Sequence, residues 1–539
     1  MAACIAALWF CYPLHFERAE TEVLAWSDVY NAGDIGGTLF LARRAAVGEE
    51  GSWTHLLQAP DGLDLDLARE FPNLLPTDLI GWFVGQWGLP LGYGLALLAL
   101  CVSNGLAVQL VARLLGAGRV AALAGGVFAA TAPLVADELL SGRPVSAWWA
   151  PAMLAVGLGL AASERVGRMW LAVPAGLALW VAIESYAFAP VLLAGWAVVG
   201  VLVGGPWRWL RAGLVGIVAI AVAWPGVSGA LEAAEGRRAA LSTSFTLYDL
   251  PAGLDTLAVH ELLSGAIGSG NLERLPATIT VLGALGALIG WRRWKQWLPP
   301  LVGGVLVLLV AMGPQPEYGT EKMKPGRGVP YTEVMNAVPL LRAVPRPTRF
   351  GLAGVQLVAL WAALAVSGRK RRWAWAGLAI GGAYAALVQT RPQQVDDTMP
   401  WPPVPGLGQV EGTELLLDLP LLMPEAQTTY LLTAAWPVPR VTPDATDFDR
   451  WLVGLNRTEH PLLMACAAIQ RGQEVPDEVM AGLAEEIPEV EGLGLRRIVL
   501  HLKASEHKPN DWLRLLRDIG AEALYWDDEV VVYRIGAEG

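Results

Sequence analysis

The sequence is poor in charged residues and in cysteine, and both shortages exclude classes of protein. Only 17% of its 539 residues are charged, whereas a soluble protein carries about a quarter. The four cysteines show no metal-ligand spacing, which argues against a zinc site and against a disulfide framework. Walker A and HExxH motifs are also absent, which argues against an ATP-driven transporter chain and a metalloprotease. The net charge of −11 gives no indication of a nucleic-acid partner.

Apolar residues, by contrast, make up 54% of the chain. Apolar runs of about 17–25 residues recur, which is the length of helix that crosses a ~30 Å hydrocarbon core. We therefore predict a mainly α, polytopic membrane helix bundle with about eleven spans. The first span is predicted to be a signal anchor, because it lacks a basic n-region and a clear cleavage site. The predicted spans are 1–16, 88–112, 118–136, 146–162, 169–186, 189–205, 209–228, 275–290, 297–312, 350–367 and 372–390.

The charges of the loops predict how these spans are oriented. Short loops rich in Arg and Lys alternate along the chain with long loops rich in acids. By the positive-inside rule the basic loops face the cytoplasm. The N-terminus is then cytoplasmic, and the region after Thr390 is extracytoplasmic. The basic loops carry Arg113 and Arg119, Arg165 and Arg168, Arg208 and Arg211, and the clusters 291–295 and 368–372; the acidic loops are 17–87, 137–145, 229–274 and 313–349.

The composition changes near residue 391, where a Pro-rich linker begins. We predict a transmembrane domain over 1–390 that includes the acidic first outer loop 17–87, the linker over 391–410, and a small extracytoplasmic α/β domain over 411–539. Roughly 135 residues suffice for one such domain. Its predicted strands are Glu414–Pro420, Thr428–Trp436 and Gly494–Leu502, its helices 459–471, 476–487 and Asp511–Ile519, and its hairpin Ala523–Ile535.

The first outer loop holds the strongest candidate for a catalytic base. Asp34 follows Gly33 and precedes Gly36, which allow a close backbone approach, and the apolar pattern after it predicts a helix along the membrane surface. A carboxylate where the chain leaves the membrane can deprotonate an acceptor hydroxyl or amine. Asp28 is the second choice. Alternatively these acids only solvate a long loop. They could also hold a divalent cation such as Mg²⁺ or Mn²⁺, although no spacing demands a metal.

The last outer loop, 313–349, has a basic excess that runs against the charge bias of the other outer loops. Arg forks bind phosphate oxygens in pairs. Arg346 and Arg349, next to a predicted span, are therefore candidates to hold the phosphate of a lipid carrier and to stabilise the charge of the leaving group. Arg342 and Lys322 are further candidates in the same loop. The alternative is that these arginines snorkel to the lipid headgroups at a helix end.

Two isolated residues complete the candidates for substrate binding. Arg143 follows Asp137 and Glu138 on an outer loop, where a local ion pair is the simpler interpretation. Glu184 lies at or within a membrane boundary, and intramembrane ionisable groups are functional candidates by default. That default lapses if Glu184 lies in the turn between the fifth and sixth spans.

Together these features resemble the GT-C superfamily of polytopic glycosyltransferases. The similar features are a first span, an aspartate in a Gly33–Asp34 setting just outside it, a long first outer loop, many further spans and a soluble C-terminal domain. The adjacent acid pair of the protein mannosyltransferases is absent, since Asp28 and Asp34 are not neighbours. Short motifs also resemble those of the superfamily: Val344–Phe350 (VPRPTRF), Leu417–Pro420 (LDLP), Gly494–His501 and Asp527–Tyr533.

The resemblance implies a GT-C-like enzyme of the bacterial inner membrane, which transfers a sugar from a polyprenyl-phosphate carrier to an acceptor on the extracytoplasmic face. Asp34 would be the base, and Arg346 and Arg349 would hold the carrier phosphate. The partners would be the lipid-linked sugar, membrane lipid and proteins of the cell envelope. Two alternatives stay open. One is a catalytically inactive GT-C-like scaffold or assembly subunit of an envelope complex, and the other is a flippase or transporter of a lipid-linked substrate.

Overall fold

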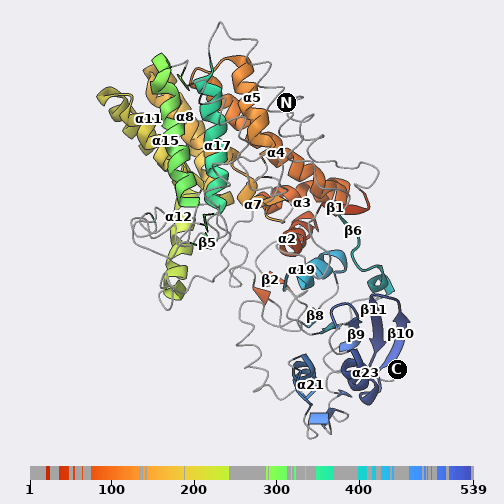
Figure 1. Ribbon diagram of the computed structural model, residues 1–539. Coiled ribbons are helices and arrows are strands. Elements are labelled where there is room, and N and C mark those ends of the chain that lie inside the picture. The colour runs from red at the N-terminus through yellow and green to blue at the C-terminus, as the bar shows by residue number, and fades with distance from the viewer. Residues whose placement is uncertain are drawn as a thin grey trace. The chain divides into compact units, whose positions relative to one another are not determined.

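The computed structural model of the chain is mostly helical and falls into two compact units (Figure 1). The helical unit comprises Met1–Leu14 and Leu95–Val395, and the mixed unit comprises His15–Gly94 and Asp396–Gly539. The predicted division of the chain into 1–390, 391–410 and 411–539 stays a prediction. The structure describes residues 20–24, 35–47, 53–54, 63–64, 75–132, 135, 138–139, 142–186, 189–241, 284, 287–288, 291–311, 317–318, 321–322, 334, 348–367, 398–409, 415–420, 426–437, 440–441, 461–470, 472–475, 479–480, 482–483, 487–488, 495–505 and 509–535.

The helical unit contains helices long and apolar enough to cross a membrane. Within the described chain there are five, at Leu89–Leu114, Pro144–Glu164, Val166–Ser185, Pro206–Gly229 and Trp291–Ala311, and each coincides with a predicted span. Two shorter apolar helices, at Arg119–Ala130 and Phe350–Ala365, coincide with two more. The predicted spans 1–16 and 372–390 lie outside the described residues, and 275–290 lies almost wholly outside them. The total of about eleven therefore stays a prediction.

The described elements of this unit are mainly helices. Its helices are α4 (Leu89–Leu114, which begins in the mixed unit), α5 (Arg119–Ala130), α7 (Pro144–Ala147), α8 (Ala150–Glu164), α9 (Ala172–Tyr186), α10 (Ala189–Leu192), α11 (Ala194–Leu202), α12 (Pro206–Leu241), α15 (Trp294–Ala311) and α17 (Thr348–Ala365). The 3₁₀ turns η2 (Val166–Leu171) and η3 (Trp291–Arg293) precede α9 and α15, and a short strand pair joins β4 (Glu317–Tyr318) to β5 (Glu321–Lys322).

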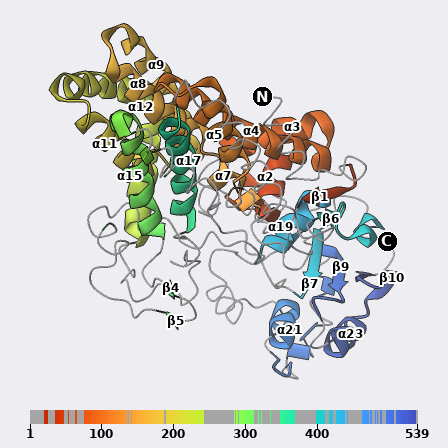
Figure 2. The same ribbon diagram turned by 45° about the horizontal axis from the view of Figure 1, so that its top comes forward.

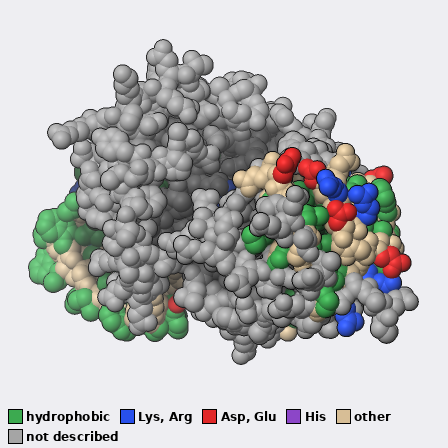
Figure 3. Space-filling model, turned by 90° about the horizontal axis from the view of Figure 1, so that it is seen from below, with side chains coloured by type: hydrophobic (Ala, Val, Ile, Leu, Met, Phe, Trp, Pro, Cys, Tyr) green, Lys and Arg blue, Asp and Glu red, His purple; other side chains and the backbone are tan. Residues whose placement is uncertain are grey.

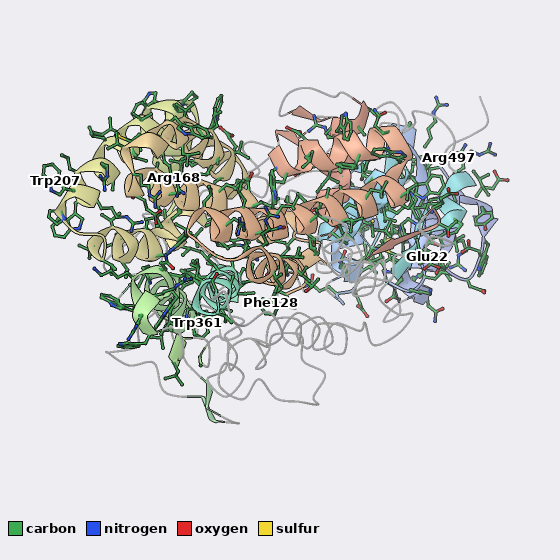
Figure 4. The ribbon with its side chains drawn as sticks, turned by 90° about the horizontal axis from the view of Figure 1, so that it is seen from above. Glu22, Phe128, Arg168, Trp207, Trp361 and Arg497 are labelled. Carbon is green, nitrogen blue, oxygen red and sulfur yellow. The ribbon has the colours of Figure 1, made fainter. Side chains whose placement is uncertain are left out.

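Helix α8 is central in the unit, and α12 is peripheral. In the span that contains α8, 72% of the most apolar stretch is buried, against 22% for α12. Trp207 on α12 points away from the neighbouring helices and is 76% exposed (Figure 4). Figure 3 shows the described surface of these helices covered by hydrophobic side chains. A helix that is apolar on its exposed face is suited to contact with lipid chains.

Small residues allow the helices of this unit to approach closely. A Cβ atom added to Gly105 on α4 would lie 2.6 Å from the carbonyl oxygen of Gly126 on α5. One added to Gly126 would lie 2.5 Å from the carbonyl oxygen of Gly105. Because neither glycine has a side chain, the two backbones touch directly, as is common between membrane helices.

Loops that are predicted to face the cytoplasm meet at one end of the bundle. Ser367, at the end of α17, accepts a hydrogen bond on Oγ from the backbone N–H of Gly118 (2.5 Å) and one on its carbonyl oxygen from Arg293 (2.5 Å). Arg168 donates to the carbonyl oxygen of Leu114 at 3.0 Å. These bonds join the segments after α4, α8 and α17 and the segment before α15.

The turn that follows α8 is also bound by arginines from α12. Arg211 donates to the carbonyl oxygens of Ser163 (2.8 Å) and Glu164 (3.1 Å), and Arg208 lies 3.7 Å from the Glu164 carboxylate. The arginines thus satisfy carbonyls that have no partner within the helix. The described basic segments after α4 and α8, before α15 and at the start of α12 thus lie close together, and the loop topology with its cytoplasmic orientation stays a prediction.

The mixed unit is built on a five-stranded sheet of order β10-β11-β9-β7-β8. Its strands are β7 (Leu415–Leu419), β8 (Arg440–Val441), β9 (Leu495–His501), β10 (Glu522–Trp526) and β11 (Val530–Arg534). Strand β7 runs parallel to β8 and β9, and the hairpin β10–β11 is antiparallel to β9. Alternate residues such as Leu417, Leu500 and Val531 form a hydrophobic core with α21 (Pro461–Gln470) and α23 (Pro509–Asp518). Figure 3 shows Lys, Arg, Asp and Glu mixed over the described surface of this unit.

Most elements predicted in the C-terminal region are confirmed, and one is wrong. Strands β7 and β9, helices α21 and α23 and the hairpin lie where the patterns placed them. The run Thr428–Trp436, predicted as a strand, belongs to helix α19 (Ala426–Ala435). Its Thr and Tyr residues favour a strand locally. The helix forms because Leu431, Ala434 and Ala435, which share one helical face, are buried there.

Segments of the first outer loop complete the mixed unit. Strand β1 (Glu22–Leu24) pairs antiparallel with β6 (Thr398–Pro400) of the predicted linker, and β2 (Trp53–Thr54) pairs with β3 (Leu63–Asp64). Helix α2 (Ile35–Val47) packs against α3 (Leu75–Trp87) and α19 (Figure 2). The apolar pattern after Asp34 thus forms the helix that was predicted. Its place at a membrane surface stays a prediction.

Candidate functional site

The residues predicted to carry the chemistry lie mostly outside the described residues. This is so for Asp28, Asp34, Arg342 and Arg346. Arg349 is the second residue of α17, and Lys322 lies in β5, and only their backbones are described. Asp34 immediately precedes the first residue of α2. The assignment of the base and of the phosphate ligands therefore stays a prediction. The structure describes only the helices next to these residues, α2 after Asp34 and α17 at Arg349.

Arg143 lies in a described polar cluster on the loop between α5 and α8. Its guanidinium is 3.8 Å from the carboxylate of Glu138, which is buried and accepts a 2.5 Å hydrogen bond from the hydroxyl of Ser146. The backbone N–H of Arg143 also donates to the carbonyl oxygen of Glu138 at 2.8 Å. The local ion pair that the sequence suggested is present, with Glu138 as the partner. A role for Arg143 in substrate binding stays a prediction.

The same loop is fastened to the bundle by Asn104 of α4. The side-chain oxygen of Asn104 accepts hydrogen bonds from the backbone N–H groups of Trp149 and Ala150, both at 2.8 Å, and its amide nitrogen donates to Ala147 at 2.8 Å. Asn104 and Trp149 are both buried. The sequence analysis missed this residue. The sequence feature that could have indicated Asn104 is an amide side chain within an apolar run. A buried amide needs hydrogen-bond partners, so such a residue is expected to bind a neighbouring segment.

Glu184 lies within α9 and not in the turn that follows it. It occupies the last helical turn, is exposed, and accepts a hydrogen bond from the indole of Trp180, one turn earlier, at 3.3 Å. A Cβ atom added to Gly226 of α12 would lie 3.4 Å from the Glu184 carboxylate. Arg168 lies in η2, directly before α9, whereas Glu184 lies in the last turn of α9. The two residues are therefore at opposite ends of this helix, and Figure 4 shows the Arg168 side chain among the helices. The proposed contact of Glu184 with substrate stays a prediction.

A buried network of charges, not assigned any role from the sequence, lies in the sheet of the mixed unit. Asp418 of β7 pairs with Arg440 of β8, and its other carboxylate oxygen is 3.0 Å from His501 Nε2 at the end of β9. The three residues are at most 5% exposed. Burial by itself raises the pKa of Asp418, but the charge of Arg440 and the hydrogen bond from His501 outweigh it and lower the pKa to about 2. The carboxylate is therefore ionised at neutral pH.

This network also holds α19. Arg440 donates from Nη2 to the carbonyl oxygen of Leu432, in the last turn of that helix, at 3.5 Å. Arg43 of α2 binds the same turn from another direction, since its Nη1 lies 2.6 Å from the carbonyl oxygen of Ala434. The sequence contained a signal for Asp418, because a carboxylate inside the strand LLLDL must be paired when it is buried. It contained none for the pairing of Arg43 with α19.

The described residues contain no group of three or more His, Cys, Asp or Glu side chains that could hold a metal ion. Most acids of the first outer loop, which could hold Mg²⁺ or Mn²⁺, lie outside these residues. Within the described part, Asn104 fixes a loop, and Arg43 and Arg440 bind the last turn of α19.

Comparison with solved structures gives the fold. No protein-family model and no curated protein matches the sequence. ArnT from Cupriavidus metallidurans in the apo state aligns with a TM-score of 0.54 at 13% identity, over 99% of this chain and 98% of ArnT. ArnT bound to undecaprenyl phosphate aligns with a TM-score of 0.52 at 12% identity, over the same shares.

A third structure agrees with these two. The arabinofuranosyltransferase AftD from Mycobacteria aligns with a TM-score of 0.50 at 17% identity, over 100% of this chain and 41% of AftD. ArnT and AftD share the GT-C-like fold. The chain therefore has a GT-C-like fold, and the fold that the sequence motifs resembled is confirmed.

Proposed function

We propose that this protein is an integral-membrane glycosyltransferase that moves a sugar from a polyprenyl-phosphate carrier to an acceptor on the extracytoplasmic face. The observation that carries the proposal is the GT-C-like fold over the whole chain, with TM-scores of 0.54 to ArnT and 0.52 to ArnT bound to undecaprenyl phosphate. Apolar helices of membrane-spanning length support it. The sequence adds Asp34, a carboxylate that immediately precedes the first residue of α2 in the chain.

In the proposed reaction Asp34 acts as the general base, with Asp28 as second choice. The carboxylate takes the proton of an acceptor hydroxyl or amine as that atom attacks the anomeric carbon of the sugar. The bond between the anomeric carbon and the phosphate oxygen breaks, and its electron pair leaves with the polyprenyl phosphate. The products are the glycosylated acceptor and the free carrier phosphate.

Arg346 and Arg349 are proposed to hold the carrier phosphate, with Arg342 and Lys322 as secondary candidates in the same loop. The described start of α17 at Thr348 supports this assignment, because it places Arg349 in the first turn of a helix and Arg346 two residues before it. The first turn has N–H groups without partners within the helix, and these favour an anion. Two guanidinium groups there would stabilise the negative charge that develops on the leaving phosphate.

The proposal is tested by measuring release of the carrier phosphate, the product common to any sugar and acceptor. The full chain is reconstituted in liposomes with membrane lipids that supply polyprenyl-phosphate sugars and acceptors, and free polyprenyl phosphate is quantified by mass spectrometry. Asp34→Asn should lower the release at least about a hundredfold, the usual contribution of a general base. The matched control Asp78→Asn changes an exposed aspartate of α3 and should leave the rate unaltered.

The same preparation separates the two alternatives. A flippase would move the lipid-linked sugar across the bilayer without releasing carrier phosphate. A scaffold would do neither, would tolerate Asp34→Asn and Arg349→Gln, and would co-purify with stoichiometric envelope proteins. Wild-type protein that releases no carrier phosphate under these conditions contradicts the enzyme assignment.

A further inference from the structure

We propose that Arg43 is a positioning residue for the base Asp34, because it fixes helix α2 to the C-terminal turn of α19. The inference rests on the proposed function and extends it. It assigns to the sheet of the mixed unit a part in the rate of transfer.

The contact joins two helices that are remote in sequence. Arg43 Nη1 donates to the carbonyl oxygens of Ala434 (2.6 Å) and Ala435 (3.4 Å), which are 391 and 392 residues further along the chain. Both carbonyls belong to the last turn of α19, where the helix itself supplies no partners. A guanidinium at this place satisfies these oxygens and also interacts favourably with the helix dipole.

Helix α19 is in turn held from the sheet. Arg440 donates to the carbonyl oxygen of Leu432 at 3.5 Å and is paired with Asp418, which binds His501. Arg440 and His501 are 0% exposed. A buried network with this many mutual partners holds its members in one geometry. The last turn of α19 is thus fixed by Arg440 on one side and by Arg43 on the other.

Helix α2 connects Arg43 to Asp34 along the chain. Ile35, which follows Asp34 in the chain and is the first residue of the helix, lies eight residues before Arg43, or about 12 Å along the helix axis. The helix cannot slide easily, because a Cβ atom added to Gly81 of α3 would lie 2.4 Å from the Cβ of Ala45. Ile35 is also buried. In this proposal the contacts of α2 set where the chain leaves the helix toward Asp34.

The expected consequence of releasing Arg43 is a lower rate at unchanged substrate binding. A displacement of about 1 Å at a reacting group can cost about a hundredfold in rate. Arg43 does not touch the acceptor or the carrier in this proposal. Its loss should therefore change kcat and leave the KM for the lipid-linked sugar as it is.

The test uses the full chain and the carrier-phosphate assay described above. Arg43→Met should lower kcat about 10–100-fold with KM changed less than about twofold, and it should accelerate amide exchange in residues 35–47. Arg43→Lys retains one donor and a charge without the fork. It should recover part of the rate. Arg517→Gln is the matched control, because the Arg517 side chain is 77% exposed.

The outcomes separate this inference from the proposed function. If Asp34→Asn is inactive and Arg43→Met turns over at the wild-type rate, the positioning role is wrong and the enzyme assignment stands. If Asp34→Asn is fully active, the proposed base is wrong whatever Arg43 does. If Arg43→Met does not fold, Arg43→Lys decides. A wild-type kcat in that variant together with faster exchange in α2 would show a structural role only.

Discussion

Replacing Asp418 with Asn is a direct test of the charges buried beneath α19. The substitution keeps the shape of the side chain and removes its charge. Arg440, which is 0% exposed, then loses its counter-ion, and His501 loses its carboxylate partner. The perturbation is thus one uncompensated charge in the interior of the mixed unit.

The expected cost is large. Removing one partner of a buried pair destabilises a protein by roughly 3–5 kcal/mol. The pKa of Asp418 gives a figure of similar order. The network lowers it to about 2 despite burial, which favours the charged form by roughly 2–3 kcal/mol over a free carboxyl. We therefore expect the opening free energy of this part of the sheet to fall by about 3 kcal/mol or more.

Amide hydrogen exchange on the full chain in nanodiscs measures this locally, which avoids a single unfolding temperature for a chain of two units. Amides of β7 and β9 should exchange at least about a hundredfold faster in Asp418→Asn. The control is Asp518→Asn, which breaks surface pairs of 3.7 Å with Arg514 and 3.6 Å with Arg517 and should cost less than about 1 kcal/mol. Exchange in Asp418→Asn within about threefold of wild type would show that the charge of Asp418 does not stabilise this part of the sheet.

Three further predictions follow from the described contacts. Asn104→Ala removes the hydrogen-bond partner of two buried N–H groups and one carbonyl. Each unsatisfied group destabilises the fold by roughly 1–3 kcal/mol, so the variant should have a lower melting temperature. An unchanged melting curve would contradict the role of this residue. Gly126→Leu should disrupt the contact of α4 with α5 and reduce the yield of monodisperse protein on size exclusion, whereas Gly159→Ala, with no atom within 4 Å of the added Cβ, should not. Because the folded pKa of Asp418 is lowered to about 2, its contribution to stability is present above the unfolded value of about 3.9 and is lost as the pH falls toward 2. Amide protection of β7, corrected for intrinsic exchange, should therefore drop over that interval in wild type and not in Asp418→Asn.

The membrane helices were predictable because their signal is local. A run of apolar residues long enough to cross a bilayer leaves little choice of structure, and the described helices coincide with predicted spans. The orientation was predicted from the excess of Arg and Lys in alternate short loops, from which the loop 313–349 departs, and it stays a prediction. The bond from the Gly118 N–H to Ser367 joins the segments after α4 and after α17.

Helix α19 was mispredicted because its burial depends on distant partners. The run Thr428–Trp436 has local preferences for a strand. Its apolar face packs on α2, a helix of the first outer loop. A single sequence gives no sign of such a contact, so tertiary packing overrides a local preference that is correct by itself.

Some charged residues could be recognised from the sequence, and others could not. Asp418 could have been recognised as buried and paired, since it interrupts a run of leucines. Its partners Arg440 and His501 could not, because strand order alone brings them together. Arg143 was correctly read as part of a local ion pair, because Glu138 is only five residues away.

In the proposed function a polyprenyl phosphate binds to Arg346 and Arg349, which lie just before and at the start of α17. The most direct measurement is a density map of the purified protein in lipid nanodiscs with undecaprenyl phosphate added. We expect elongated lipid density whose phosphate lies against Arg346 and Arg349, with Asp34 facing the same cavity. A cavity filled by side chains, with Asp34 paired to an arginine and turned away, would contradict it.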